Sequence, residues 1–261
     1  MLRTRVITAL IGIPLLIGIL YAGEMFRIGF FLLLALAGMY EFAGMMKEAG
    51  RPAPVLPALL FAMAFLLVEV VAYPLMPLLF ITLFLAVFKA VTNYPHTSFD
   101  NTAMVMFFGA YMGVCLSYAI KISVMEQGAA WCLLAFFLTW ASDIGGYMAG
   151  SKWGKHKLAP QLSPNKTWEG SLGGILLTSL VALLFFSLTD MVNLINAYAL
   201  LLGVLASVAA QFGDLFMSGV KRFFQVKDSG HLIPGHGGVL DRFDSFLVVV
   251  PLVYFFLQYL G

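Results

Sequence analysis

The sequence has little charge for its length. Asp, Glu, Lys and Arg together make up 11% of its 261 residues, against roughly 25% in ordinary globular domains. Hydrophobic residues account for 61% of the chain, and its mean hydropathy is +0.94. So few charged side chains cannot cover the surface of a water-soluble protein, and the composition therefore indicates an integral membrane protein.

Cysteine and basic runs are scarce as well. The two cysteines, Cys115 and Cys132, lie in apolar segments without the spacing of metal ligands, so we interpret them as packing residues. The net charge is only +2, and the chain has no basic tail. Nothing in the composition therefore indicates nucleic acid as a partner.

Long apolar segments dominate the remaining pattern. A segment of about 17 or more apolar residues can cross the hydrocarbon core as a helix. The sequence contains nine, over residues 5–22, 26–46, 55–72, 74–91, 103–122, 130–149, 170–189, 195–216 and 244–260. It therefore predicts an all-α, polytopic integral membrane protein with about nine transmembrane helices. The third and fourth segments meet at Tyr73 and Pro74, where a single kinked or re-entrant element is an alternative.

The distribution of Lys and Arg predicts the orientation, because short loops rich in these residues stay in the cytoplasm. With the N-terminus inside, the cytoplasmic loops are 47–54, 92–102, 150–169 and 217–243. The cytoplasmic side then holds 13 of the 15 basic residues: Arg3, Arg5, Lys47, Arg51, Lys89, Lys152, Lys155, Lys157, Lys166, Lys221, Arg222, Lys227 and Arg242. Only Arg27 and Lys121 fall on the other side. We therefore expect a cytoplasmic N-terminus and, because no targeting extension is visible, a bacterial inner membrane.

Polar residues are concentrated in the second half of the chain. The two longest polar segments, 150–169 and 217–243, share the predicted cytoplasmic side. We expect residues 1–130 to form a scaffold of transmembrane helices. Residues 131–261 are expected to carry the functional site on transmembrane helices and cytoplasmic loops.

Asp143 is the only acid of the predicted sixth span. Gly146 and Gly150 follow at spacings that place all three residues on one helical face. A packing seam would explain the glycines, because small residues let membrane helices approach closely. It would not explain a carboxylate at membrane depth, where ionisable residues are costly and mark functional sites. We expect Asp143 to coordinate a metal or to contact a bound cation.

The polar loop after this span ends in a predicted helix start. Ser163 followed by Pro164 is typical of an N-cap and the first helical residue. Because free N–H groups at a helix start favour anions, Ser163, Asn165, Lys166 and Thr167 are expected to bind a substrate phosphate. The other lysines of this loop are explained equally well by topology or by attraction to anionic headgroups.

The most charged stretch lies between the eighth and ninth spans. Asp214, Ser218 and Lys221 are spaced to share one face of a continuous helix, and so are Asp241 and Asp244 at the start of the ninth span. Carboxylates converging from two helices suit Mg²⁺, which prefers oxygen ligands and usually binds one or two carboxylates together with substrate phosphates.

The same stretch carries groups suited to bind phosphates. Its cations are Lys221, Arg222, Lys227 and Arg242. Arginine can engage a phosphate with two hydrogen bonds. Gly237 and Gly238 would let the backbone approach a ligand closely. Salt bridges closing a loop are the alternative, but they would not require these glycines. We assign His236 to the site because of its neighbours.

One known family has a signature similar to this stretch. Residues 218–244 read SGVKRFFQVKDSGHLIPGHGGVLDRFD, which resembles the signature of phosphatidate cytidylyltransferases, also called CDP-diglyceride synthases. The matching positions are Ser218, Lys221-Arg222, Lys227-Asp228, His236-Gly237-Gly238 and Asp241-Arg242-Phe243-Asp244. SDIGGYMAG and LSPNKTWEGSLGG are similar to further blocks of the family, so the resemblance covers about residues 139–250. Residues 1–130 match only in hydropathy.

The resemblance implies transfer of a cytidylyl group from CTP to phosphatidic acid, which gives CDP-diacylglycerol and pyrophosphate and requires Mg²⁺. Expected metal ligands are Asp214, Asp241, Asp244 and Asp143. Expected catalytic residues are Lys221, Arg222, Lys227, Asp228, His236 and Arg242. Expected substrate-binding residues are Ser163, Asn165, Lys166, Thr167, Ser218, Gly237 and Gly238. The expected partners are CTP, phosphatidic acid and the lipid bilayer. The resemblance does not decide whether the protein forms a homodimer.

A cation- or proton-coupled membrane transporter is the alternative from another class. The carboxylates of Asp143 and Asp214 alone would suffice for it, but transporters tend to have repeated halves with matching broken helices. A CDP-alcohol phosphotransferase and a CTP-dependent lipid kinase are nearer alternatives. The Ala-Arg pair typical of the first is absent from this sequence.

Overall fold

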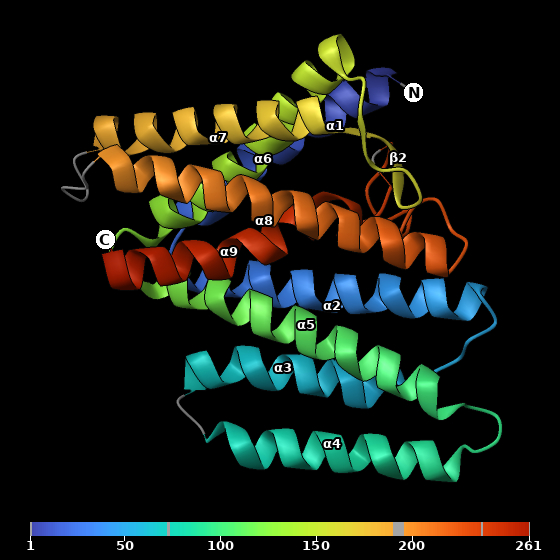
Figure 1. The fold of residues 1–261 in the computed structure, drawn as a ribbon. Coiled ribbons are helices and arrows are strands. Elements are labelled where there is room, and N and C mark those ends of the chain that lie inside the picture. Colours follow the sequence, from blue (N-terminus) through green and yellow to red (C-terminus); the bar gives the residue numbers. More distant parts are fainter. Residues whose placement is uncertain (1, 72–73, 190–195, 236, 261) are drawn as a thin grey trace. The chain divides into compact units, whose positions relative to one another are not determined.

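The computed structural model describes residues 2–71, 74–189, 196–235 and 237–260. Over these residues the chain is almost entirely helical, with one short β-hairpin (Figure 1). The elements are α1 (Leu2–Tyr21), α2 (Glu24–Glu48), α3 (Val55–Val71), α4 (Leu75–Thr92), α5 (Phe99–Val124), α6 (Gly128–Trp153), β1 (Lys157–Ala159), β2 (Ser163–Thr167), α7 (Trp168–Thr189), α8 (Asn196–Phe223) and α9 (Leu240–Leu260). The predicted all-α class is confirmed, and each apolar segment of the sequence corresponds to one helix.

Six helices of the described residues, namely α2, α4, α5, α6, α7 and α8, are long and apolar enough to cross a membrane. Helix α3 and the Leu10–Tyr21 part of α1 are apolar but shorter. Along α4, Phe80, Phe84 and Phe88 are 70%, 59% and 51% exposed, as expected where lipid takes the place of water. The chain is therefore a helical integral membrane protein.

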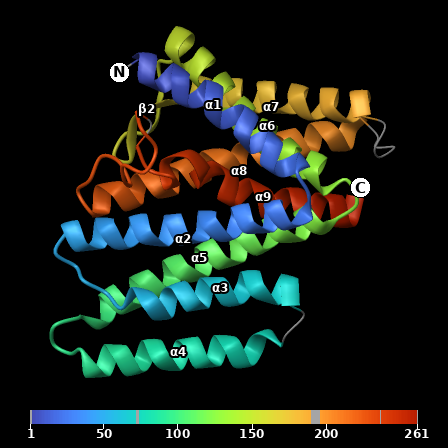
Figure 2. The same ribbon diagram turned by 180° about the vertical axis from the view of Figure 1, so that it is seen from behind.

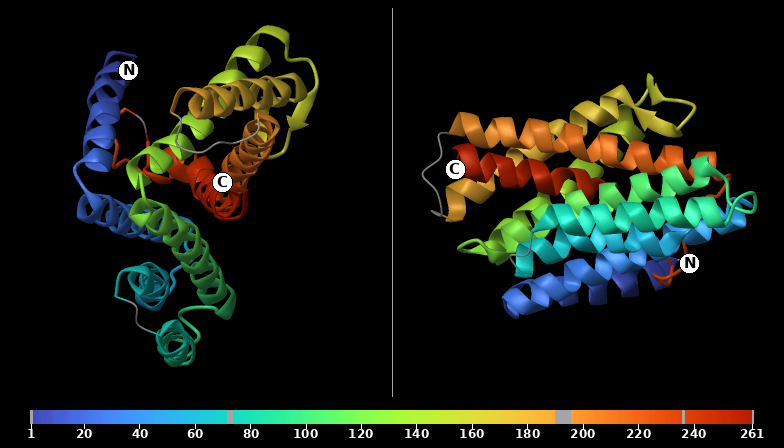
Figure 3. Two further views of the ribbon diagram at one scale, coloured as in Figure 1. Left: turned by 90° about the vertical axis from the view of Figure 1, so that its left-hand side faces the viewer. Right: turned by 90° about the horizontal axis from the view of Figure 1, so that it is seen from below.

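The third and fourth apolar segments form two separate helices. Helix α3 ends at Val71 and α4 begins at Leu75, and the two lie side by side (Figures 2 and 3). Pro74, the residue before α4, has an extended conformation with φ −61° and ψ 123°. Because proline has no N–H and a fixed φ, it is well suited to the position just before a new helix. The alternative of a single kinked element was wrong.

The chain folds into two compact units. The first consists of Met1–Val124 and Phe223–Arg242, and the second of Met125–Arg222 and Phe243–Gly261. The end of α8 and the start of α9 thus belong to the unit of the N-terminal helices. The expected roles of residues 1–130 and 131–261 stay a prediction.

In the first unit, α5 packs closely against α2 and α3. The Phe108 ring stacks on Phe42 of α2, with centroids 3.8 Å apart, and Phe224 lies edge-on to Phe42 at 5.5 Å. A Cβ atom on Gly109 would lie 2.5 Å from the Ala58 carbonyl oxygen of α3. Glycine at position 109 therefore lets the two backbones touch, which is how membrane helices gain packing energy.

The two basic residues outside the predicted cytoplasmic set both have partners in the first unit. Arg27 donates hydrogen bonds to the carbonyl oxygens of Ser123 and Leu20, each at 2.9 Å. Lys121 forms an ion pair of 3.3 Å with Glu69. Each of these cations therefore has a specific acceptor. We attribute the placement of Arg27 and Lys121 away from the predicted cytoplasmic side to these contacts.

The second unit contains a tight seam between α6 and α7. A Cβ atom on Gly145 would overlap the Gly173 carbonyl oxygen, and one on Gly173 would lie 2.7 Å from the Gly145 oxygen. Gly146 also lies at the seam, since a Cβ atom on Gly170 would lie 2.9 Å from its oxygen, but a Cβ atom on Gly146 itself would meet its nearest neighbour, the Gly170 oxygen, at 3.6 Å. The helix-packing seam anticipated from the sequence exists, but Gly145 forms its closest approach.

This seam predicts a difference between two neighbouring alanine variants. Gly145→Ala is expected to lower the free energy of unfolding by about 1–3 kcal/mol, the usual cost of overpacking. The control Gly146→Ala makes only an ordinary contact and gains helix propensity, so it is expected to match the wild type. Thermal unfolding in detergent measures both, and equal midpoints for the two variants would contradict the seam.

Candidate active site

The segment before α7 differs from its predicted structure. The sequence predicted a helix start at Ser163, but residues 163–167 form β2, which pairs antiparallel with β1, and α7 begins at Trp168. Pro164 fits this short edge strand because its fixed φ suits an extended chain that needs no N–H from it. The expected helix start at Ser163 was wrong, and the anion site inferred from free N–H groups there is withdrawn.

Thr167 provides the cap of α7. Its Oγ1 accepts a hydrogen bond from the Gly170 N–H at 3.1 Å, as an N-cap hydroxyl does. The Trp168 N–H donates to the His156 carbonyl oxygen at 2.9 Å and closes the hairpin. Glu169 Oε1 lies 2.6 Å from His156 Nδ1, and its Oε2 accepts the Lys155 N–H at 3.1 Å. These contacts fix the strand that carries Lys166.

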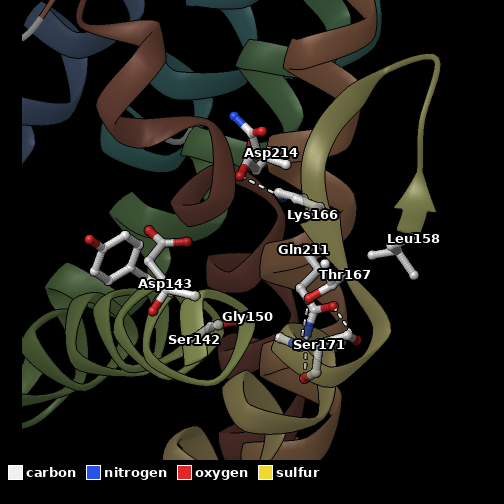
Figure 4. Close-up of a pocket in the computed structure, with 14 residues that line it drawn as sticks. Ser142, Asp143, Gly150, Leu158, Lys166, Thr167, Ser171, Gln211 and Asp214 are labelled. Carbon is white, nitrogen blue, oxygen red and sulfur yellow. Dashed lines mark hydrogen bonds and ion pairs between the residues drawn. The ribbon is translucent and has the colours of Figure 1, made fainter. Parts of the chain in front are cut away.

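A pocket of about 470 Å³ opens in the second unit between α6, the hairpin, α7 and α8 (Figure 4). Five predicted site residues line it: Asp143, Asn165, Lys166, Thr167 and Asp214. Gly146 and Gly150 line it as well, so the face they were predicted to share with Asp143 faces this pocket. The volume lies in the range of about 300–1,000 Å³ typical of small-molecule sites.

Lys166 and Asp214 form an ion pair in this pocket. The Lys166 ammonium lies 2.5 Å from Asp214 Oδ2, and the side chains are 24% and 31% exposed. Ser218 donates a hydrogen bond to Asp214 Oδ1 at 3.2 Å, which confirms their predicted common helix face. A cation and a carboxylate that face the same space can receive a phosphate and a metal ion, respectively.

Asp244 is a third carboxylate of the second unit, in addition to Asp143 and Asp214. Asp244 at the start of α9 is 8% exposed and within electrostatic reach of Asp143, Asp214 and Lys221. Its Oδ1 accepts the Ser245 N–H at 2.7 Å. Among the described residues, no three His, Cys, Asp or Glu side chains are grouped closely enough to hold a metal ion by themselves. The donors nevertheless suit Mg²⁺, because it usually binds only one or two carboxylates beside substrate phosphates.

In the first unit, Asp241 organises the loop before α9. Its Oδ2 accepts hydrogen bonds from the Ser229 N–H at 2.8 Å, the Ser229 hydroxyl at 3.0 Å and the Gly238 N–H at 3.0 Å. Gly237 has φ +84°, a left-handed conformation that favours glycine. His236 lies outside the described residues, so its predicted role stays a prediction.

The remaining signature residues are mostly exposed. Arg222, Lys227, Asp228 and Arg242 are exposed, and Lys221 is half-buried. Exposed cations can reach a solute phosphate, but their individual roles stay predictions.

Sequence reasoning missed polar residues of both units. Glu41, in the middle of α2, is 3% exposed. In the pocket, Ser171 Oγ donates to Gln211 Oε1 at 2.5 Å, and the Gln211 amide donates to Ser207 Oγ at 3.2 Å. Each could have been found by the argument that identified Asp143, because a lone polar side chain in an apolar span requires a partner or a function.

Comparison with known proteins supports the resemblance over the whole chain. Residues 3–260 match the cytidylyltransferase family. The phosphatidate cytidylyltransferase of Staphylococcus epidermidis is 36% identical over 260 residues, which cover 97% of each chain. That of Staphylococcus aureus (strain COL) is 34% identical over 263 residues, again 97% of each chain. That of Bacillus subtilis (strain 168) is 42% identical over 180 residues, 69% of this chain and 66% of its own.

These matches include the N-terminal helices, which resembled the family only in hydropathy. With the signature residues they confirm the predicted relationship. The chain belongs to the cytidylyltransferase family, together with its phosphatidate cytidylyltransferase members.

Proposed function

We propose that the protein transfers a cytidylyl group from CTP to phosphatidic acid, forming CDP-diacylglycerol and pyrophosphate for phospholipid biosynthesis. The observation that carries this proposal is the similarity to phosphatidate cytidylyltransferases over 97% of both chains. It favours this enzyme over a transporter, a CDP-alcohol phosphotransferase or a lipid kinase.

The reaction needs no protein nucleophile. A phosphate oxygen of phosphatidic acid attacks the α-phosphorus of CTP, and the bond from that phosphorus to the oxygen bridging to the β-phosphate breaks. Pyrophosphate leaves with that oxygen. The chain's own contribution is then to position the two substrates and to neutralise phosphate charge.

We assign the second-unit pocket to phosphate binding. Lys166 offers its ammonium group there, and Asn165 and Thr167 offer polar side chains beside it. Lys221, Arg222, Lys227 and Arg242 are proposed to hold the remaining phosphate charge. Attraction of Lys166 to an incoming phosphate would release Asp214 from the ion pair observed between them.

We further propose that Asp143, Asp214, Asp241 and Asp244 hold Mg²⁺. When bound, Mg²⁺ supplies neutralisation of the charge on the phosphate oxygens. The support is the chemistry of the donors: Asp143 and Asp214 act electrostatically on the buried carboxylate of Asp244. Such a group is stabilised by a cation.

For the topology we propose nine spans with a cytoplasmic N-terminus in a bacterial plasma membrane. The bias of 13 among 15 basic residues toward one side supports the orientation. The named relatives are bacterial proteins, which supports the location. CTP would then reach loops 150–169 and 217–243 from the cytoplasm, with residues 1–130 as scaffold and residues 131–261 carrying the chemistry.

The activity is tested with purified protein in detergent, labelled CTP, phosphatidic acid and Mg²⁺. The expected product is a lipid-soluble cytidine compound formed together with pyrophosphate. In the control, diacylglycerol replaces phosphatidic acid. A CTP-dependent lipid kinase would phosphorylate diacylglycerol and release CDP, so release of CDP in this control would identify a kinase. A preparation that binds CTP but forms no lipid-soluble cytidine would overturn the proposal.

Removal of Mg²⁺ gives a separate expectation. Excess chelator is expected to reduce product formation to background, because phosphate charge would no longer be neutralised. Added Mg²⁺ is expected to restore the rate, whereas added Na⁺ at equal ionic strength is not. Full activity in chelator would contradict the assignment of the carboxylates to a metal ion.

A further inference from the structure

A buried glutamate of α2 holds the loop before α9. Glu41 is 3% exposed. Its Oε1 accepts the Val239 N–H at 2.7 Å, and its Oε2 accepts the Leu240 N–H at 2.9 Å. The same Oε2 lies 3.0 Å from the Ser229 hydroxyl oxygen. These bonds offset the high cost of burying a carboxylate. In Figures 1 and 2 the loop lies beside α2, as the bonds require.

The two backbone groups bound by Glu41 belong to the start of a helix. Helix α9 begins at Leu240, and the first N–H groups of a helix have no acceptor within it. A side chain just before the helix usually provides one, but the side chain of Val239 has no polar atom to offer. Glu41 therefore caps α9 from another helix, and its negative charge suits the positive end of the helix dipole.

Two glycines of the loop leave room for the Glu41 carboxylate. A Cβ atom on Gly230 would lie 2.8 Å from Glu41 Oε1, and one on Gly238 would lie 2.5 Å from Glu41 Oε2. Real Cβ atoms do not approach this closely. Gly238 was expected to allow close approach of a ligand, and its contacts show that it allows the close approach of Glu41.

Ser229 links Glu41 to Asp241. Its hydroxyl oxygen lies 3.0 Å from Glu41 Oε2 and 3.0 Å from Asp241 Oδ2. Asp241 Oδ2 also accepts the N–H groups of Ser229 and Gly238. The two carboxylates therefore hold the same loop, and a displacement of one changes the hydrogen bonds of the other.

From these contacts we propose that Glu41 is a positioning residue of the active site. It fixes the start of α9 and thereby the place of the Asp241 carboxylate, to which we assign Mg²⁺ binding. The inference rests on the proposed function, since only the transfer reaction gives Asp241 that role. Glu41 itself does not touch the substrates in this assignment.

The first test needs no activity. Glu41→Gln replaces one acceptor oxygen by an NH₂ group, so that one of the two N–H bonds at the start of α9 loses its acceptor. In detergent without Mg²⁺ or substrate, hydrogen exchange of the amides in residues 229–240 is expected to accelerate severalfold. Exchange in α3 and α4 is expected to stay unchanged. Glu24→Gln makes the same change at an exposed residue in the first turn of α2 and is expected to exchange like the wild type.

The second test measures Mg²⁺ dependence. Glu41→Gln is expected to lower turnover about 10- to 100-fold, as loss of an outer partner of a metal ligand commonly does. The Mg²⁺ concentration for half-maximal activity is expected to rise, and excess Mg²⁺ to restore part of the rate. A variant that was only less stable would show no such shift. Ser229→Ala, which removes one link, is expected to shift the dependence in the same direction but less.

Wild-type exchange and wild-type Mg²⁺ dependence in Glu41→Gln would overturn the inference. If that variant does not fold, Ser229→Ala decides in its place, and unchanged exchange and Mg²⁺ dependence in it would overturn the inference equally. Measurements on the wild type distinguish a failure of the proposed function from a failure of the inference about Glu41. If it forms no lipid-soluble cytidine, the proposed function fails, whereas the exchange experiment still tests whether Glu41 holds the loop.

Discussion

Asp241→Asn is expected to lower turnover roughly a thousandfold or more in a protein that still folds. Asparagine keeps an oxygen that can accept the N–H bonds of Ser229 and Gly238, so the loop before α9 is expected to keep its structure. The variant loses the negative charge, and a neutral amide is a weaker ligand for a hard cation than a carboxylate. Formation of lipid-soluble cytidine measures the loss, and hydrogen exchange of residues 229–240 measures the loop.

Asp100→Asn is the matched control for this change. The Asp100 side chain is 66% exposed and lies 3.5 Å from Arg51, and exposed pairs of this kind contribute little to stability. We expect wild-type turnover from it. Wild-type turnover of Asp241→Asn would show that Asp241 is not a metal ligand. Lost turnover accompanied by faster exchange of the loop would show that its contribution is structural.

Gly238→Ala is expected to have the second largest effect. The new Cβ atom would overlap the Ser229 hydroxyl oxygen and lie 2.5 Å from Glu41 Oε2. Both neighbours are buried, so the loop itself must move, which we expect to cost at least about 1–3 kcal/mol of stability. Turnover is expected to fall about a hundredfold, because displacements of this size near reacting groups have effects of that order. Thermal unfolding in detergent and the cytidine assay measure the two effects.

Gly29→Ala serves as its control. No atom lies within 4 Å of a Cβ atom built on Gly29 in α2, and alanine favours a helix over glycine by about 1 kcal/mol. This variant is expected to be at least as stable as the wild type and fully active. If Gly238→Ala behaved like Gly29→Ala, the close contact between Glu41 and the loop would be disproved.

The helices could be predicted because their signal is local. Every membrane helix must be apolar along its own length, so hydropathy alone located α1 to α9 to within a few residues at most ends. The face shared by Asp214 and Ser218 was also predictable, since helical spacing decides it without reference to any other element. The family could be predicted because its signature combines several charged residues at fixed spacing.

What could not be predicted depends on partners distant in the chain. The Ser163–Thr167 strand exists because it pairs with Lys157–Ala159, and the local Ser-Pro pattern carries no information about that pairing. Gly145 leaves less room for a Cβ atom than Gly146 because of where α7 lies. The role of Glu41 depends on Val239 and Leu240, which lie 198 and 199 residues further along the chain.

The hairpin between α6 and α7 also has a consequence for solvation. In the hydrocarbon region of a bilayer no water is present to bond the backbone, and each unpaired backbone amide there is costly. Pairing of β1 with β2, the Trp168 bond to the His156 carbonyl, and acceptance of the Lys155 N–H by Glu169 satisfy such groups within the connection itself. The segment that carries Lys166 can therefore approach the hydrocarbon region without leaving these backbone groups unpaired.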